Sequence, residues 1–107
     1  MKKNKVVFSR YAESDLVEIL DYFIAFNPAY AKQTLENIET KVQGLKDFPE
    51  SGRVVPELAL QNIMNYRELI EDVYRIIYSI EPEMIIIHSV IDSRRNLEDL
   101  LVRKFMK

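Results

Sequence analysis

The chain has 107 residues and a formal net charge of −2 at pH 7, with 48% hydrophobic and 30% charged residues. This length fits one domain that buries its own core. The chain contains no cysteine, one histidine and two glycines. This composition excludes disulfides, thiolate or multi-histidine metal sites and a glycine-rich phosphate loop. The slightly acidic balance gives the whole molecule no strong attraction to nucleic acid.

Nothing in the sequence predicts contact with a membrane. No apolar run reaches the roughly 18 residues that a membrane-spanning helix needs. The basic segment Met1–Lys5 is followed by only three apolar residues before Ser9, which is too short for the core of a signal peptide. We therefore expect a cytoplasmic protein.

The first half of the chain predicts a short strand and a helical hairpin. Val6–Phe8 is a β-branched and aromatic run, and Ser9 is placed to cap the following helix. Asn27 and Pro28 supply the cap and first residue of a second helix, which Pro49 ends. The two helices carry apolar stripes at helical spacing: Ala12, Leu16, Ile19, Leu20, Phe23 and Ile24, and then Ala31, Leu35, Ile38, Val42, Leu45 and Phe48. The acids of the first helix lie mostly off its stripe and predict either a solvated surface or one that faces a basic partner: Glu13, Asp15, Glu18 and Asp21.

The second half predicts three strands and a terminal helix. Residues 49–62 form a loop with a short helical turn at 57–61. The predicted strands are Met64–Ile70, Val73–Ile80 and Met84–Ile91, and the last is apolar enough to be central and covered on both faces. Leu97, Leu100, Leu101 and Phe105 form the stripe of an amphipathic helix. The order β-α-α-β-β-β-α predicts an α+β domain, with the helical hairpin packed on a mostly antiparallel four-stranded sheet.

Arginines recur at regular places along these strands. Arg67 and Arg75 lie within predicted strands, where an arginine is costly to bury without a partner. Two interpretations stay open: contact with an anionic or protein partner, or ion pairing with Glu68, Glu71 or Asp72 across the hairpin. Arg94 and Arg95 follow the last strand and precede a helix, where functional residues concentrate.

The remaining polar groups of the strands favour structural roles. Tyr74 and Tyr78 are expected in the core with hydrogen-bonded hydroxyl groups. His88 lies inside the last predicted strand, and a single histidine there is more often structural than catalytic. No pattern predicts a metal site, and we expect no cofactor.

Taken in order, these residues resemble the RelE/ParE superfamily, the toxins of bacterial type II toxin–antitoxin pairs. The likeness covers nearly the whole chain. It rests on Phe8-Ser9, Ala12, Asp15-Leu16, Ile19, Tyr22, Asn27-Pro28, Ala31, Leu45, Pro49, Gly52-Arg53, Arg67, Tyr74-Arg75-Ile76, Tyr78, Val90 and Arg94-Arg95.

The pattern of residues 12–16, 27–28 and 49–53 is most similar to the ParE branch. That resemblance implies a non-enzymatic toxin that inhibits DNA gyrase by protein–protein contact and is neutralised by a cognate, ParD-like antitoxin. It implies that the antitoxin's C-terminal segment wraps on the terminal helix, the helical hairpin and the sheet. The candidate partner-binding residues are Arg67, Arg75, Arg94, Arg95, Leu97, Leu100, Leu101 and Phe105.

Two alternatives remain within the superfamily. A RelE-like ribosome-dependent mRNA endonuclease would use Arg75, Arg94 and Arg95 in catalysis. The chain after Arg95 lacks the tyrosine or histidine that such enzymes often carry there. The other alternative is a degenerate member that binds antitoxin without being toxic. Many ParE-like members carry His-Gly-Arg-Arg after the last strand, whereas this chain has Asp92-Ser93-Arg94-Arg95, so Asp92 can pair with a neighbouring arginine.

Overall fold

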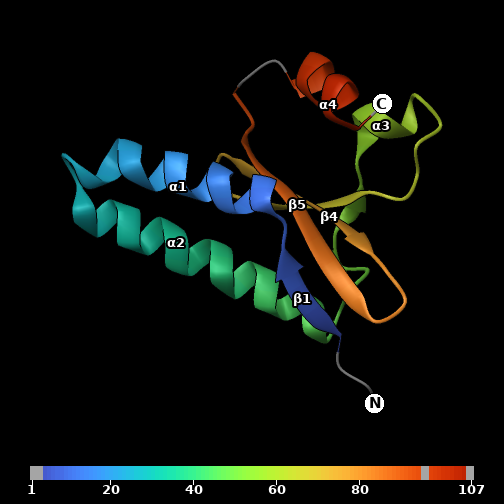
Figure 1. Ribbon diagram of the computed structural model, residues 1–107, viewed down its shortest axis with the longest axis horizontal. Coiled ribbons are helices and arrows are strands. Elements are labelled where there is room, and N and C mark those ends of the chain that lie inside the picture. Colours follow the sequence, from blue (N-terminus) through green and yellow to red (C-terminus); the bar gives the residue numbers. More distant parts are fainter. Residues whose placement is uncertain (1–3, 95–96, 106–107) are drawn as a thin grey trace.

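The computed structural model describes residues 4–94 and 97–105. The elements along the chain are β1 (Lys5–Phe8), α1 (Arg10–Ile24), α2 (Pro28–Gln43), the 3-10 turn η1 (Gly44–Lys46), β2 (Arg53–Val54), α3 (Pro56–Ala59), β3 (Arg67–Glu71), β4 (Tyr74–Ile80), β5 (Met84–Asp92) and α4 (Leu97–Phe105). The hairpin of α1 and α2 covers one face of a sheet, and α3 and α4 lie together on the other side (Figure 1).

The sheet confirms the predicted class and corrects its strand number. Its order is β1-β5-β4-β3-β2, and every pair is antiparallel except the parallel pair β1–β5. The prediction of a mostly antiparallel sheet under a helical hairpin is therefore confirmed. The fifth strand, β2, was not predicted because a two-residue strand is too short to show alternation. The prediction that the last strand is central is also confirmed, since β5 lies between β1 and β4.

The helix starts follow the predicted caps. The Ser9 hydroxyl accepts a hydrogen bond from the Ala12 amide at 3.1 Å, and the Asn27 side chain accepts one from the Tyr30 amide at 3.1 Å. Pro28 occupies the first position of α2. The Ser9 hydroxyl also donates to the His88 carbonyl at 3.1 Å, which ties the start of α1 to the middle of β5.

Two residues of the predicted apolar stripes are exposed. Ile24 is the last residue of α1 and is 57% exposed. It belongs to the tip of the helical hairpin, which projects past the sheet (Figure 1). Phe48 is 71% exposed because α2 ends at Gln43 and the chain passes through η1 before reaching it. The prediction that both belong to the core-facing stripe is therefore wrong.

Each face of the sheet carries its own apolar core. On the hairpin side, the helix residues Ile38 and Val42 share a cluster with Tyr74, Ile76 and Tyr78 of β4. On the opposite side, the buried members are Val55, Leu58, Ile77, Ile91 and Leu101. Successive residues of β4 face opposite sides of the sheet, since Ile76 and Ile77 belong to different clusters. Among the described residues, no helix has the length and hydropathy to cross a membrane.

A close backbone approach near β2 requires a glycine. The Tyr78 hydroxyl donates to the Pro49 carbonyl at 2.7 Å and accepts from the Gly52 amide at 3.0 Å. A Cβ atom at Gly52 would lie 2.5 Å from the Glu68 carbonyl oxygen and 2.6 Å from the Tyr78 hydroxyl. The predicted core position of Tyr78, with its hydroxyl hydrogen-bonded, is therefore confirmed.

We expect Gly52→Ala to destabilise the protein by about 1–3 kcal/mol, because the added methyl group overpacks this contact. Gly44→Ala is the matched control. Gly44 has open space around the position of a Cβ and right-handed helical backbone angles, so its replacement should stabilise the protein by about 0.4–1 kcal/mol. Urea unfolding measures both free energies of unfolding. Equal stability of Gly52→Ala and the unmodified protein would contradict the requirement for glycine.

Candidate functional site

A buried carboxylate lies at the centre of an ion cluster on the sheet. Glu68 of β3 is 1% exposed. Arg53 of β2, its direct cross-strand neighbour, donates from Nε to Glu68 Oε2 at 2.6 Å. Arg75 of β4 donates from Nε to the other oxygen, Oε1, at 2.5 Å. Both carboxylate oxygens are therefore held by arginines, one from each neighbouring strand, as a buried charge requires.

Arg75 is also engaged by a second carboxylate. Its two terminal nitrogens donate to Glu57 of α3 at 2.7 and 2.8 Å in a bidentate pair. The hydrogen bond from Arg75 is the main cause that lowers the pKa of Glu57 below its ordinary value, and the same bond raises the pKa of Arg75. Arg75 is 5% exposed. A phosphate could reach this guanidinium only by displacing a carboxylate.

Among the described residues, the structure shows ion pairing for one of the two strand arginines, Arg75, but not for the other, Arg67. Arg75 pairs with Glu68, one of the three acids considered from the sequence. Its second partner, Glu57, was not predicted, although a glutamate directly after Pro56 is typical of a helix start. Arg67 contacts carbonyl groups instead, and donates to Gly52 at 2.7 Å and to Glu50 at 3.5 Å. It therefore holds the loop before β2.

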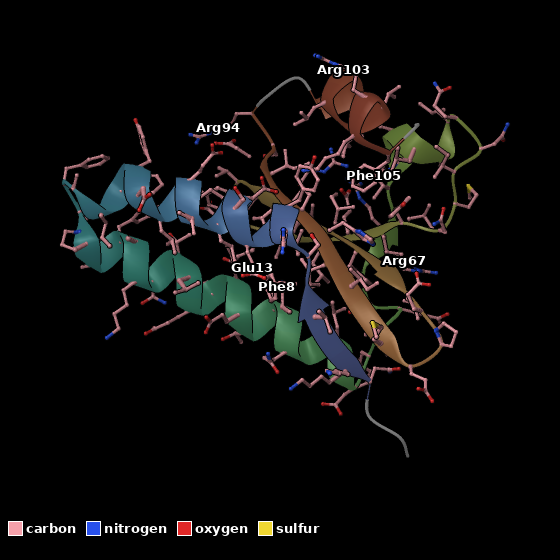
Figure 2. All side chains as sticks on the ribbon, in the orientation of Figure 1. Phe8, Glu13, Arg67, Arg94, Arg103 and Phe105 are labelled. Carbon is pink, nitrogen blue, oxygen red and sulfur yellow. The ribbon has the colours of Figure 1, made fainter. Side chains whose placement is uncertain are left out.

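Arg94 lies at the far end of β5 and is paired with its neighbour. Its side chain donates to both oxygens of Asp92, with a shortest distance of 2.5 Å, and remains 67% exposed. This pair raises the pKa of Arg94 and matches the pairing expected of Asp92. Figure 2 shows Arg94 well apart from Arg67. Arg95 lies outside the described residues.

The terminal helix α4 packs on the sheet through part of its predicted stripe. Leu101 is fully buried in the apolar core on the face of the sheet opposite the hairpin, and Leu100 and Phe105 are partly buried against that core. Phe105 points from α4 toward the sheet (Figure 2). The side chain of Leu97 lies outside the described part of the chain. Leu101 can therefore contact another protein only if α4 leaves the sheet.

A polar contact involving Asp15 links α1, β5 and α4. The Asp15 carboxylate accepts from the Ser89 hydroxyl at 2.7 Å and from the Val90 amide at 2.9 Å. Lys104 of α4 donates to the Ser89 hydroxyl at 2.8 Å, and its Nζ lies 3.7 Å from the Asp15 carboxylate. The prediction that Asp15 belongs to a solvated acidic surface is therefore wrong. Its spacing of three from Ala12 and four from Ile19 places it on the core-facing side, and this spacing is the sequence signal for its buried contacts.

His88 is half-buried beside Phe105 of α4. Its Nε2 lies 2.7 Å from the Ser79 hydroxyl, which donates to Glu81 at 3.0 Å. Its ring packs edge-on against Tyr66 at 5.2 Å and Phe105 at 6.1 Å. Desolvation lowers the pKa of His88, so the neutral ring is favoured in the folded protein. This environment agrees with the structural role expected for it.

The predicted arginines do not converge on one site. Arg67, Arg75 and Arg94 lie at three separate places: beside the loop before β2, inside the ion cluster and after β5. The part of the chain that the structure describes contains no group of three or more His, Cys, Asp or Glu side chains placed to hold a metal ion.

Comparison with known proteins assigns the family. A family model described as "ParE toxin of type II toxin-antitoxin system, parDE" matches residues 6–97. The chain belongs to the ParE toxin family. A solved structure described as "Chromosomal ParDE TA system from P. aeruginosa" shares the fold, with a TM-score of 0.67, 18% sequence identity and coverage of 84% of this chain and 96% of that chain. A comparison with curated proteins finds no match. The ParE branch predicted from the sequence is confirmed.

We expect Glu57 to contribute to stability in a pH-dependent way. Because its pKa is lowered in the folded protein, its contribution is present above its ordinary value of 4.5 and is lost as the pH falls through the folded value. Glu57→Gln should therefore lower the urea midpoint at neutral pH and flatten its fall below about pH 4.5.

Glu39→Gln on the exposed surface of α2 is the control, and it should change stability by less than about 0.5 kcal/mol. Urea midpoints of the three proteins from about pH 3 to about pH 7 provide the measurement. If Glu57→Gln and the unmodified protein gave the same profile, Glu57 would not stabilise the fold through Arg75.

Proposed function

We propose that this ParE-family protein is a cytoplasmic toxin that inhibits DNA gyrase by protein–protein contact and is neutralised by a ParD-like antitoxin. The observation that carries the proposal is the engagement of Arg75 by two carboxylates. Cleavage of RNA through its 2′-hydroxyl needs an acid, a base and a cation free to stabilise the phosphorane. Arg75 stabilises the sheet instead, so inhibition by surface contact is the mechanism that best fits the residues.

The candidate partner-binding residues divide by accessibility. Arg94 is exposed, and Arg67, Leu100 and Phe105 are partly exposed. These side chains are available to a partner. Arg75 and Leu101 are buried, and they support the sheet and the packing of α4. We therefore assign gyrase contact to the region around Arg94 and Arg95.

The antitoxin is assigned to the surface of α4 and the adjoining sheet. The apolar stripe of α4 is only partly covered, with Leu100 and Phe105 at the edge of the second core. A partner segment that folds on binding can extend such a core by packing along a partly exposed helix. This assignment separates the antitoxin surface from the arginines after β5, and the two surfaces can be tested independently.

We expect the double substitution Arg94→Ala and Arg95→Ala to weaken inhibition of gyrase supercoiling by about tenfold or more, as loss of interface arginines commonly does. Antitoxin affinity should stay within about twofold of the unmodified value, since exposed side chains outside an interface contribute little. Folding should persist because exposed ion pairs add little stability.

Arg10→Ala, at an exposed arginine at the start of α1, is the control and should inhibit gyrase as the unmodified chain does. Supercoiling assays and calorimetric titration with antitoxin measure the two properties. Undiminished inhibition by the double variant would show that these arginines do not contact gyrase. An equal loss of antitoxin binding would show that the two surfaces overlap.

A further inference from the structure

A groove runs between the helical hairpin and the ends of β4 and β5. Its main pocket has a volume of about 310 Å³, with walls formed by Ile19, Tyr22 and Phe23 of α1 and by Tyr74 of β4. A smaller pocket of about 50 Å³ continues along α2 and shares Tyr74. The main pocket is large enough for one bulky apolar side chain, and Tyr74 joins it to the smaller pocket beside α2.

The apolar surface beside this groove is exposed and internally braced. Tyr22 is 68% exposed and Phe26 is 64% exposed. Their rings pack edge-to-face at 5.5 Å, Tyr22 contacts Phe23 at 5.0 Å, and Phe23 contacts Tyr30 at 4.7 Å. Such packing holds the rings in place before any partner arrives, so binding costs less ordering of the surface. Large exposed apolar patches of this kind typically mark interaction sites.

The rim of the groove is acidic. Among the residues that the structure describes, Glu18, Glu71, Asp72 and Asp92 line the two pockets, and the one lining cation, Arg94, is paired with Asp92. Within residues 4–94 and 97–105, no ion pair involves Glu18, Glu71 or Asp72. Covering these carboxylates with a neutral surface would remove their hydration without compensation. A complementary partner therefore brings lysine or arginine side chains.

We propose that this groove binds a basic amphipathic segment of a partner protein. One bulky apolar side chain of the segment enters the pocket against Tyr22, Phe23 and Tyr74. Flanking lysines or arginines lie opposite Glu18 and Asp72. The proposal goes beyond gyrase inhibition, because it specifies the chemistry of a docked segment on the hairpin side and holds whichever protein is the toxin's target.

The test titrates the full chain with fluorescein-labelled synthetic peptides of about twelve residues, long enough for three helical turns. The first peptide carries leucines at helical spacing among lysines. A second replaces lysine with glutamate, and a third replaces leucine with serine. We expect only the lysine–leucine peptide to bind, with an affinity that falls as salt concentration rises.

Matched variants locate the binding site. Glu18→Lys should weaken binding by about tenfold, whereas Glu39→Lys, which makes the same charge change on the exposed surface of α2, should not. Tyr22→Ala should also weaken it by about tenfold, whereas Phe48→Ala removes an equally exposed ring elsewhere and should leave it unchanged. Thermal unfolding checks that each variant folds. If Tyr22→Ala does not fold, the comparison of Glu18→Lys with Glu39→Lys still tests the groove.

Three results would overturn the proposal. One is equal binding of the lysine–leucine and lysine–serine peptides, which would indicate charge attraction alone. The second is equal affinity of Glu18→Lys and Glu39→Lys, which would place the peptide elsewhere. The third is a dimer by light scattering that Tyr22→Ala converts to a monomer, which would make a second copy of this chain the occupant.

Discussion

The pairing of strands β2, β3 and β4 and the position of helices α3 and α4 depend on the buried carboxylate of Glu68. An ionised carboxylate away from water is tolerated only with close cationic partners, and Glu68 finds them on both neighbouring strands. Because strand residues alternate between faces, a register slip of one residue would move Glu68 away from both arginines. Arg75 extends the pairing to Glu57 and so positions α3, whose Leu58 shares a buried cluster with Leu101 of α4. One ion cluster thus fixes the strand register and the position of α3, against which the terminal helix α4 packs.

This use of Arg75 has a consequence for function. A guanidinium group at the centre of a sheet could serve phosphate chemistry if its donors were free. Here the donors are directed at two carboxylates, and the guanidinium is almost fully buried. The residues that remain accessible lie on the outside, at the end of β5, on α4 and along the groove beside the hairpin. This distribution is the reason for our proposal that the protein acts by binding.

The sequence predicted those features that arise from local patterns. The caps at Ser9 and Asn27, both long helices and the three long strands each had a periodic or capping signal several residues in length. The unpredicted features depend on contacts between distant segments. β2 exists through pairing with β3, and the partnership of Glu57 with Arg75 joins residues 18 positions apart in sequence. Ile24 and Phe48 had apolar character at about the right spacing, but Ile24 lies at the tip of the hairpin and Phe48 follows the end of α2.

The central claim is that this protein acts on gyrase rather than on messenger RNA, and one purified, antitoxin-free sample tests it in two assays. The first follows supercoiling and DNA cleavage by gyrase, and the second follows mRNA cleavage on programmed ribosomes. We predict inhibited supercoiling, accumulated gyrase-dependent DNA cleavage and intact mRNA. Cleaved mRNA with normal gyrase would contradict the claim and return Arg75 to a catalytic role. Inactivity in both assays would contradict it as well, and would indicate a family member without toxicity.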